Sequence, residues 1–191
     1  MISLQKKLIL ASNSPRRKQL LTDAGFEFTV EALPTDESFP ATLPTGEVAA
    51  YISREKAEVF QGVRPEHLIL TADTVVIADH QILAKPVDQA DAFRMLQMLS
   101  GRSHQVVTAV SLLADDSIQT VSDSATVYFR ELEDSEITYY IEQYKPFDKA
   151  GSYGIQEWIG MVGIGKIEGS FYTIMGLPVH IVYQLLRPHF K

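Results

Sequence analysis

Residues 8–17, Leu-Ile-Leu-Ala-Ser-Asn-Ser-Pro-Arg-Arg, predict a short strand, a tight turn and the start of a helix. The apolar residues at the beginning are typical of a buried strand. Ser14 is a suitable N-cap, and Pro15 suits the first helical position because its missing N–H would have no intrahelical partner there. The apolar-spaced run that follows ends at Gly25, a natural left-handed stop. We therefore expect a strand followed by a capped helix.

The N-terminus of this helix has groups that bind anions. Free amides and the positive end of the helix dipole favour a negative charge there. Arg16 and Arg17 add planar guanidinium groups that match phosphate oxygens, and Ser12 and Ser14 add hydroxyls. The alternative is a capped helix with two solvated arginines, and residues 8–17 alone leave both interpretations open.

Composition limits the class of protein. The chain has 191 residues, enough for one large domain or two small lobes. Its 46% apolar and 21% charged residues are ordinary for a soluble globular protein. The absence of cysteine excludes disulfides and thiolate metal sites, so a metal would be held by oxygen or histidine.

Charge and hydropathy limit the partners and the location. A net charge of −7 argues against binding to duplex nucleic acid, and the basic residues near the first turn suit a small anionic ligand better. No apolar run approaches the ~20 residues needed to span a bilayer, and the N-terminus lacks the apolar core of a signal peptide. We therefore expect a cytoplasmic protein with no membrane or nucleic-acid partner.

Further elements follow from the periodicity of apolar residues. We expect strands over 26–33, 68–78, 81–84, 104–114, 117–129, 160–168 and 171–175. We expect helices over 46–60, 88–99 and 134–144 and from 178 onward, the first three capped by Thr45, Asp88 and Asp134. Asp115 and Asp116 are typical of a hairpin turn between the two longest strands. Strands alternating with helices, plus one antiparallel pair, predict an α/β fold with a mixed, twisted sheet and flanking helices, in two lobes with a central cleft.

Two charged residues interrupt apolar patterns. Lys56 lies in the apolar stripe of helix 46–60, where it either extends to the edge of the core or reaches an internal anion. Asp73 interrupts strand 68–78, which is apolar on both faces and so belongs in the middle of the sheet. An ionised carboxylate there is costly unless it is paired or bound to a metal. The alternative is a core carboxylate that accepts hydrogen bonds from backbone amides.

The unusual charged residues together suit phosphate chemistry with a hard divalent cation. Carboxylates at Glu37 and Asp73 are the oxygen ligands that Mg²⁺ or Mn²⁺ prefers. Lysines and arginines neutralise phosphoryl oxygens as charge builds in a transition state. No Gly-x-x-x-x-Gly-Lys-Ser/Thr motif is present. We expect His104 to be structural, and Tyr153 and Trp158 either to stack on a ligand or to be core aromatics.

Seven segments, in order along the chain, carry a family resemblance. They are residues 12–17, 54–57, 72–76, 85–86, 99–104, 148–156 and 176–178. This set resembles the Maf family of nucleotide pyrophosphatases over about residues 8–186. The resemblance implies a single domain over 1–191 with an ITPase-like fold, and a cytoplasmic homodimer. It implies hydrolysis of a nucleoside triphosphate to the monophosphate and pyrophosphate with Mg²⁺ or Mn²⁺. The family is also linked to inhibition of septum formation and to removal of non-canonical nucleotides.

The resemblance implies catalytic roles. Asp73 matches the proton acceptor. Glu37, Lys56 and Lys85 match the charged groups around the metal and the phosphates, and Glu37 and Asp73 are the implied metal ligands.

The resemblance also implies a substrate. Arg16, Thr74 and Gln156 match positions that set base preference, and Ser12, Ser14 and Arg17 complete the implied substrate-binding set. The run 149–156 resembles the subgroup that prefers dTTP and UTP. The Gln156 amide offers a donor and an acceptor, which suit the O4/N3 edge of thymine or uracil.

Two departures from the family pattern concern substrate preference. Thr173 stands where many members carry Asn, and Glu-Trp-Ile at 157–159 replaces smaller residues, which can narrow the base pocket.

Two other functions stay open. One is a non-catalytic regulator of division that senses dTTP or UTP, although a sensor has no need of Asp73 and Glu37 together. The other is the same chemistry on 7-methyl-GTP.

Overall fold

A computed structural model describes residues 2–191 as a mixed α/β protein. The strands are β1 (Lys7–Leu10), β2 (Phe28–Val30), β3 (His67–Ala78), β4 (Gln81–Leu83), β5 (Ser103–Ala114), β6 (Ser117–Phe129) and β7 (Ile164–Glu168). They form one sheet in the order β2-β1-β3-β5-β6-β7, with β4 paired to β3. β1 is parallel to both β2 and β3, whereas β4 and β7 are antiparallel to β3 and β6. The predicted mixed sheet is therefore confirmed, and β3 is an interior strand.

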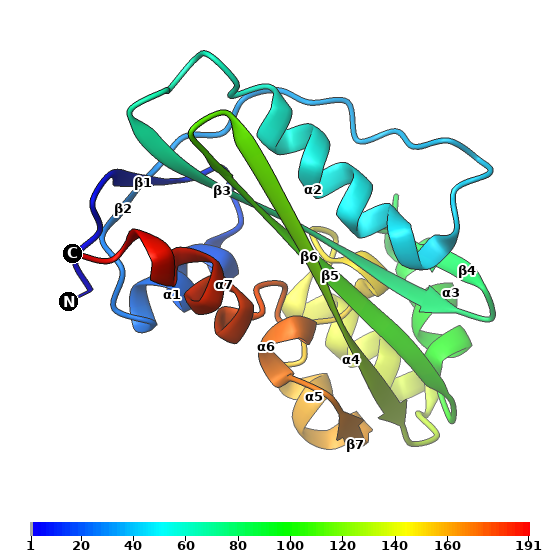
Figure 1. The fold of residues 1–191 in the computed structure, drawn as a ribbon. Coiled ribbons are helices and arrows are strands. Elements are labelled where there is room, and N and C mark those ends of the chain that lie inside the picture. The colour runs from blue at the N-terminus through cyan, green and yellow to red at the C-terminus, as the bar shows by residue number, and fades with distance from the viewer. Residues whose placement is uncertain (1) are drawn as a thin grey trace. The chain divides into compact units, whose positions relative to one another are not determined.

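Helices lie between single strands or pairs of strands along the chain, and two helices follow β7 (Figure 1). They are α1 (Pro15–Asp23), α2 (Val48–Glu58), α3 (Gln89–Leu99), α4 (Asp134–Tyr144), α5 (Trp158–Gly163), α6 (Phe171–Ile174) and α7 (Val179–Leu186). Short 3₁₀ turns cover Thr45–Glu47, Ala150–Ser152 and Arg187–His189. No helix within residues 2–191 is long and apolar enough to cross a bilayer.

The chain forms two compact units, which agrees with the two predicted lobes, and the central cleft stays a prediction. Unit 1 holds the residues up to 73 together with 108–123 and 176–191, and unit 2 holds 74–107 and 124–175. The long strands β3, β5 and β6 each contribute residues to both units.

In unit 1, α2 packs on the sheet through apolar and hydroxyl contacts. Ala57 and Phe60 pack with Ile9 and Ile69 in one buried cluster. A buried hydroxyl network stands beside that cluster. It joins Ser53 Oγ to Thr71 Oγ1 (3.2 Å) and Ser111 Oγ (2.9 Å), and Ser111 Oγ to Thr120 Oγ1 (2.8 Å). These hydrogen bonds join α2 to β3 and β5 through polar groups that are satisfied inside the protein. Ser53 lies one turn before Lys56 in α2.

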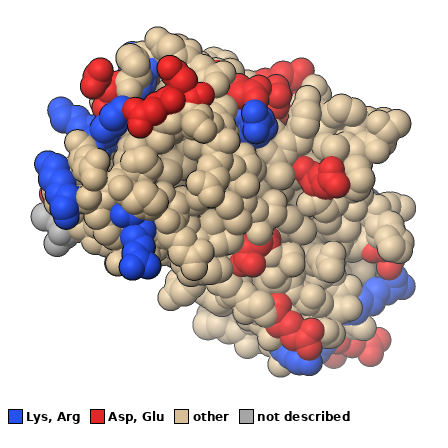
Figure 2. Space-filling model, viewed as in Figure 1, with Lys and Arg blue, Asp and Glu red and all other residues tan. Residues whose placement is uncertain are grey.

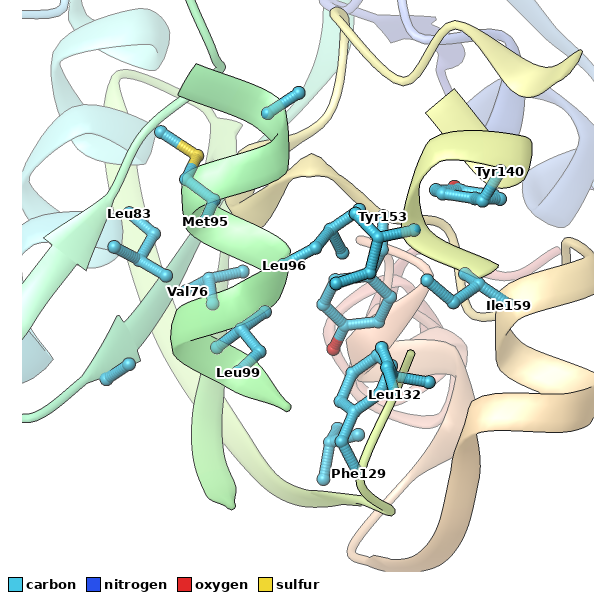
Figure 3. Close-up of a cluster of buried hydrophobic side chains, with 14 of the residues drawn as sticks. Val76, Leu83, Met95, Leu96, Leu99, Phe129, Leu132, Tyr140, Tyr153 and Ile159 are labelled. Carbon is cyan, nitrogen blue, oxygen red and sulfur yellow. The ribbon is translucent and has the colours of Figure 1, made fainter. Parts of the chain in front are cut away.

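In unit 2, side chains of α3, α4 and the strands enclose an apolar core (Figure 3). Tyr153 lies in the middle of the labelled side chains, with Leu96 and Leu99 of α3 on one side and Ile159 on the other. Tyr140 of α4 is fully buried at the edge of the same cluster.

Several local predictions are confirmed. The Ser14 side chain caps α1 by accepting from the Arg17 amide, Pro15 is the first helical residue, and Gly25 adopts φ +81°. Asp88 caps α3 through the Asp91 amide. Asp115 and Asp116 both adopt positive φ (49° and 62°), the geometry of a tight hairpin turn.

The segment 158–175 corrects two predicted strands. α5 occupies the first part of the expected strand 160–168, and α6 replaces the expected strand 171–175. Short apolar runs carry no periodicity that separates a strand from a helix. A β-carbon on Gly160 would lie 1.8 Å from the Ile155 carbonyl oxygen, so this glycine permits a close approach between α5 and the preceding segment.

Other boundaries also differ. β2 pairs with β1 over Phe28–Val30 and ends where β1 ends at Leu10, while Phe26 forms an isolated parallel bridge with Ile2. Thr45 makes no side-chain cap and begins a 3₁₀ turn. The N-cap of α4 is Glu133 in place of Asp134, since Glu133 and Glu136 form a capping box.

Candidate active site

Lys56 lies between two carboxylates in unit 1. Its Nζ is 2.8 Å from Asp73 Oδ1 and 2.7 Å from Glu37 Oε1. α2 supplies the lysine, the interior strand β3 supplies Asp73, and the segment between β2 and the 3₁₀ turn at Thr45–Glu47 supplies Glu37. Asp73 is therefore an ion-paired carboxylate, and Lys56 reaches an internal anion.

Burial differs across this cluster. The Asp73 and Lys56 side chains are 12% and 15% exposed, whereas that of Glu37 is 53% exposed. Burying a carboxylate without a partner is costly, and the Lys56 ammonium is the partner of Asp73. The Glu37 side of the cluster faces solvent.

The carboxylates of this cluster fit a magnesium-type ion. Mg²⁺ is commonly held by one or two carboxylates, with waters and substrate phosphates as the other ligands. Within the part of the chain that the structure describes, no group of three or more His, Asp or Glu side chains is placed to hold a metal by itself. Glu37 and Asp73 are the two carboxylates that would hold such an ion together with a phosphate substrate.

Arg17 connects the anion-binding turn to the strand that bears Asp73. Its Nη1 donates to the Ala72 carbonyl (2.7 Å), and its Nε donates to the Gly176 carbonyl (2.8 Å). Nη1 also lies 3.4 Å from Ser12 Oγ. Burial lowers the pKa of the guanidinium, while the charge of Asp73 acts in the opposite direction. Arg17 therefore fixes the backbone immediately before Asp73.

The two serines of the turn are also engaged locally. Ser12 Oγ accepts from the Ser14 amide (3.3 Å), and Ser14 Oγ caps α1. Arg16 lies partly buried in the first turn of α1. The structure thus brings Ser12, Ser14 and Arg17 together, and direct contact of these residues with substrate stays a prediction.

Three predicted site residues belong to unit 2. Thr74 follows Asp73 in β3 and is partly buried, and Lys85 is exposed shortly after β4. Gln156 is exposed and lines a hollow of about 540 Å³. Gln156 and Lys166 are the hydrogen-bonding side chains among its otherwise apolar lining, a composition typical of small-molecule sites.

Of the aromatic candidates, His104 and Tyr153 are buried in unit 2, and Trp158 is partly buried. His104 is buried and its Nε2 lies 2.7 Å from Tyr153 Oη. Burial lowers the pKa of His104 to about 4, so the ring is neutral at pH 7. Tyr153 packs edge-on against Phe129 in the core, and Trp158 packs against Tyr139 at 4.9 Å between ring centroids.

The surface charge is mixed. On the face shown in Figure 2, Lys and Arg side chains are interrupted by acidic and uncharged ones. This face has no continuous basic stripe of the kind that follows a nucleic-acid backbone.

The chain matches the family model "Maf-like protein" over residues 7–189. The chain belongs to the Maf family. A dTTP/UTP pyrophosphatase from Bacteroides fragilis is 48% identical over 183 residues, which cover 95% of each chain. A dTTP/UTP pyrophosphatase from Porphyromonas gingivalis is 49% identical over 185 residues, 95% of this chain and 93% of the relative. In fold, the chain is similar to the Staphylococcus aureus Ham1 protein, with a TM-score of 0.57, 13% identity and coverage of 96% and 99%.

Membership of the Maf family confirms the resemblance drawn from the seven segments. The structure groups Glu37, Lys56, Asp73 and Arg17 in unit 1, whereas Lys85 and Gln156 belong to unit 2. The role assigned to each residue by the resemblance stays a prediction.

A second charged cluster, in unit 2 of this Maf protein, was not predicted. Glu157 accepts from Tyr140 Oη through one carboxylate oxygen, and its other oxygen lies 3.1 Å from Lys149 Nζ. Lys149 is also 2.7 Å from Asp148 Oδ1. Two sequence signals were available: Lys149 lies in a family segment, and Glu157 departs from the family pattern. Neither signal indicated that Glu157 contacts Tyr140 and Lys149, because α4, which bears Tyr140, is brought to Glu157 only by the tertiary fold.

Proposed function

We propose that this chain hydrolyses dTTP and UTP to the nucleoside monophosphate and pyrophosphate. The observation that carries the proposal is the Glu37–Lys56–Asp73 cluster, in which a buried carboxylate on an interior strand is paired with a lysine beside a solvent-facing glutamate. The names and the 48–49% identity of the two Maf relatives support the substrate class.

In the proposed reaction a water oxygen attacks the α-phosphorus. A new P–O bond forms while the bond from that phosphorus to the oxygen shared with the β-phosphorus breaks, and that oxygen leaves with pyrophosphate. Asp73, paired with Lys56, orients the water and accepts its proton. Lys56, Lys85 and Arg16 offset the negative charge that builds on the phosphoryl oxygens.

A divalent cation is part of the proposal. Glu37 and Asp73 would hold Mg²⁺ or Mn²⁺, with the triphosphate and water as further ligands. When bound, such an ion supplies Lewis-acid stabilisation of phosphoryl charge and lowers the pKa of water. Arg17 keeps Asp73 in position for this ligation through the Ala72 carbonyl.

Base preference is assigned to Gln156. Its exposed amide offers a donor and an acceptor beside an apolar hollow, which suits the polar edge and flat faces of thymine or uracil. Thr74 and Arg16 complete the proposed substrate contacts. We further propose a cytoplasmic homodimer that acts on the nucleotide pool, with any effect on septum formation following from turnover.

The test is pyrophosphate release from a panel of nucleoside triphosphates with Mg²⁺, Mn²⁺ or EDTA. Asp73→Asn should lower kcat by about 10²–10⁴-fold because it removes the proton acceptor. Asp115→Asn is the matched control, since Asp115 also pairs with a lysine, Lys6 at 2.6 Å, but lies on the exposed hairpin turn of unit 1. Full activity of Asp73→Asn would overturn the assignment.

The same panel separates the alternatives. A division regulator that only senses nucleotides would bind dTTP or UTP but release no pyrophosphate at high enzyme and metal concentrations. An enzyme specific for 7-methyl-GTP would prefer that nucleotide, and Gln156→Ala would leave its substrate ranking unchanged.

A further inference from the structure

Gln156 is an exposed residue between neighbours that are each held in place. On one side, the Gly154 amide donates to Tyr140 Oη at 3.0 Å, and the Ile155 side chain is buried in the unit 2 core. On the other side, the Glu157 carboxylate is held by Tyr140 and Lys149. Tyr140 therefore contacts the chain on both sides of Gln156.

The turn itself is closed and closely packed. The Glu157 amide donates to the Gly154 carbonyl at 3.0 Å, closing a four-residue turn around Gln156. A β-carbon on Gly154 would lie 2.9 Å from Gln156 Nε2 and from Glu157 Cδ. The Gln156 amide thus packs against the glycine backbone, in a position that depends on where residues 154 and 157 are held.

The charged side chains of the Tyr140–Glu157–Lys149 cluster have little access to solvent. The Lys149 and Glu157 side chains are 9% and 17% exposed, and Tyr140 is fully buried. Tyr140 comes from α4, whose buried face packs in the unit 2 core, so the turn is attached to a helix of the core. A side chain that is ordered before binding loses less entropy when it forms hydrogen bonds to a ligand.

We propose that Tyr140, Glu157 and Lys149 are positioning residues that set base selectivity by holding the Gln156 amide in its binding orientation. The inference rests on the proposed function, in which Gln156 contacts the base. Glu157 departs from the family pattern, and the inference gives it a role. Its carboxylate accepts from Tyr140 and pairs with Lys149.

The test measures kcat and KM for dTTP, UTP, dCTP and ATP in the full-length enzyme. Tyr140→Phe should raise KM for dTTP and UTP about tenfold, the effect of one misaligned hydrogen-bonding group, with kcat within about twofold. KM for ATP should stay unchanged, so the preference for dTTP over ATP falls. Glu157→Gln, which keeps an acceptor for Tyr140 but loses the charge paired with Lys149, should move the same ratio by less.

The matched control is Tyr128→Phe. Tyr128 Oη also donates to a glutamate, Glu168, at 3.0 Å in unit 2, but this pair is exposed. Tyr128→Phe keeps the Lys166–Glu168 ion pair beside the hollow, so the substrate ratios of this variant should equal those of the natural chain. A general loss of stability in Tyr140→Phe would lower kcat for every substrate together, and that result would overturn the positioning role.

A double-mutant cycle shows whether the effect passes through Gln156. Gln156→Ala combined with Tyr140→Phe should lose no more selectivity than Gln156→Ala alone, because the group to be positioned is already absent. Additive losses would overturn the inference.

Amide exchange at Gly154 gives an independent readout. Protection of that amide should fall in Tyr140→Phe and not in Tyr128→Phe, because the Tyr140 hydroxyl is its acceptor. If Gln156→Ala leaves selectivity unchanged while this protection falls as expected, the assigned base contact in the proposed function fails. If Gln156→Ala changes selectivity and Tyr140→Phe does not, only the positioning role fails.

Discussion

Two clusters in unit 2 use the same three residue types in different surroundings. In one, Tyr140 and Lys149 hold Glu157 with side chains that are 9% (Lys149) and 17% (Glu157) exposed. In the other, Tyr128 and Lys166 hold Glu168 with side chains that are 60% (Lys166) and 53% (Glu168) exposed. The second cluster even has the shorter lysine–glutamate distance, 2.5 Å against 3.1 Å. Burial, and not the length of the contact, should decide which cluster matters for stability and positioning.

The physical reason lies in what replaces each contact when it breaks. Water can solvate Lys166 and Glu168 as soon as their ion pair opens, and salt screens their attraction. Lys149 and Glu157 have little access to water, so loss of either partner leaves a charge largely unsolvated. The buried cluster can therefore hold a turn in one conformation, whereas the exposed cluster cannot.

The largest expected difference is between two lysine substitutions. Lys149→Met should lower the free energy of unfolding by about 3 kcal/mol, because Glu157 then stays buried without its cationic partner. Adding Glu157→Gln should recover part of that loss. Lys166→Met should give no change that urea unfolding resolves. Equal effects of the two lysine substitutions would remove the distinction between the clusters.

The second largest effect should come from acid, which lowers the free energy of unfolding through the buried His104 of unit 2. The pKa of His104 is about 4 in the folded chain and about 6.5 in the unfolded chain. Between these values the unfolded chain binds more protons, so this contribution to stability is fully present above about pH 6.5 and is lost as the pH falls toward 4. The loss amounts to about 3 kcal/mol at full extent.

The measurement is the free energy of unfolding against pH, with His104→Gln as the reference chain. The difference between the two chains should shrink as the pH falls from 7 to 4. A constant difference over this range would contradict a buried neutral His104.

Salt should produce the smallest effect, and it should weaken the ion pair of the exposed cluster more than that of the buried cluster. Raising NaCl to about 1 M shortens the Debye length to about 3 Å, which screens charges in contact with solvent. The coupling energy of Lys166 and Glu168 in a double-mutant cycle should vanish under these conditions, while that of Lys149 and Glu157 should persist. Equal sensitivity to salt would show that water reaches both pairs.

Local structure was largely predictable because its causes are local. The cap at Ser14, the left-handed Gly25 and the tight turn at Asp115 and Asp116 follow from side-chain and backbone geometry within a few residues. The interior position of β3 followed from its apolar residues on both faces. The expected strand 160–168 was confirmed over β7 (Ile164–Glu168) and wrong before it, where α5 forms and Gly160 packs closely on the preceding segment. The expected strand 171–175 was wrong, because a short apolar run does not distinguish a strand from a helix.

The predicted site was partly accessible from sequence. Asp73 and Lys56 were conspicuous because each breaks an apolar pattern, and the structure shows Lys56 paired with both Asp73 and Glu37. The contacts of Arg17 were not predicted. Its guanidinium donates to the Ala72 and Gly176 carbonyls, which belong to segments distant in sequence.

The sequence by itself determined the α/β class, the Maf membership and the charged residues suited to phosphate chemistry, because motifs and periodicity are properties of neighbouring residues. Only the tertiary structure decided which of two Tyr–Glu–Lys sets is buried, and so which one can hold Gln156 in place. A sequence lists the side chains that can pair. The free energy of a pair depends on access of water to it, which is set when distant segments pack together.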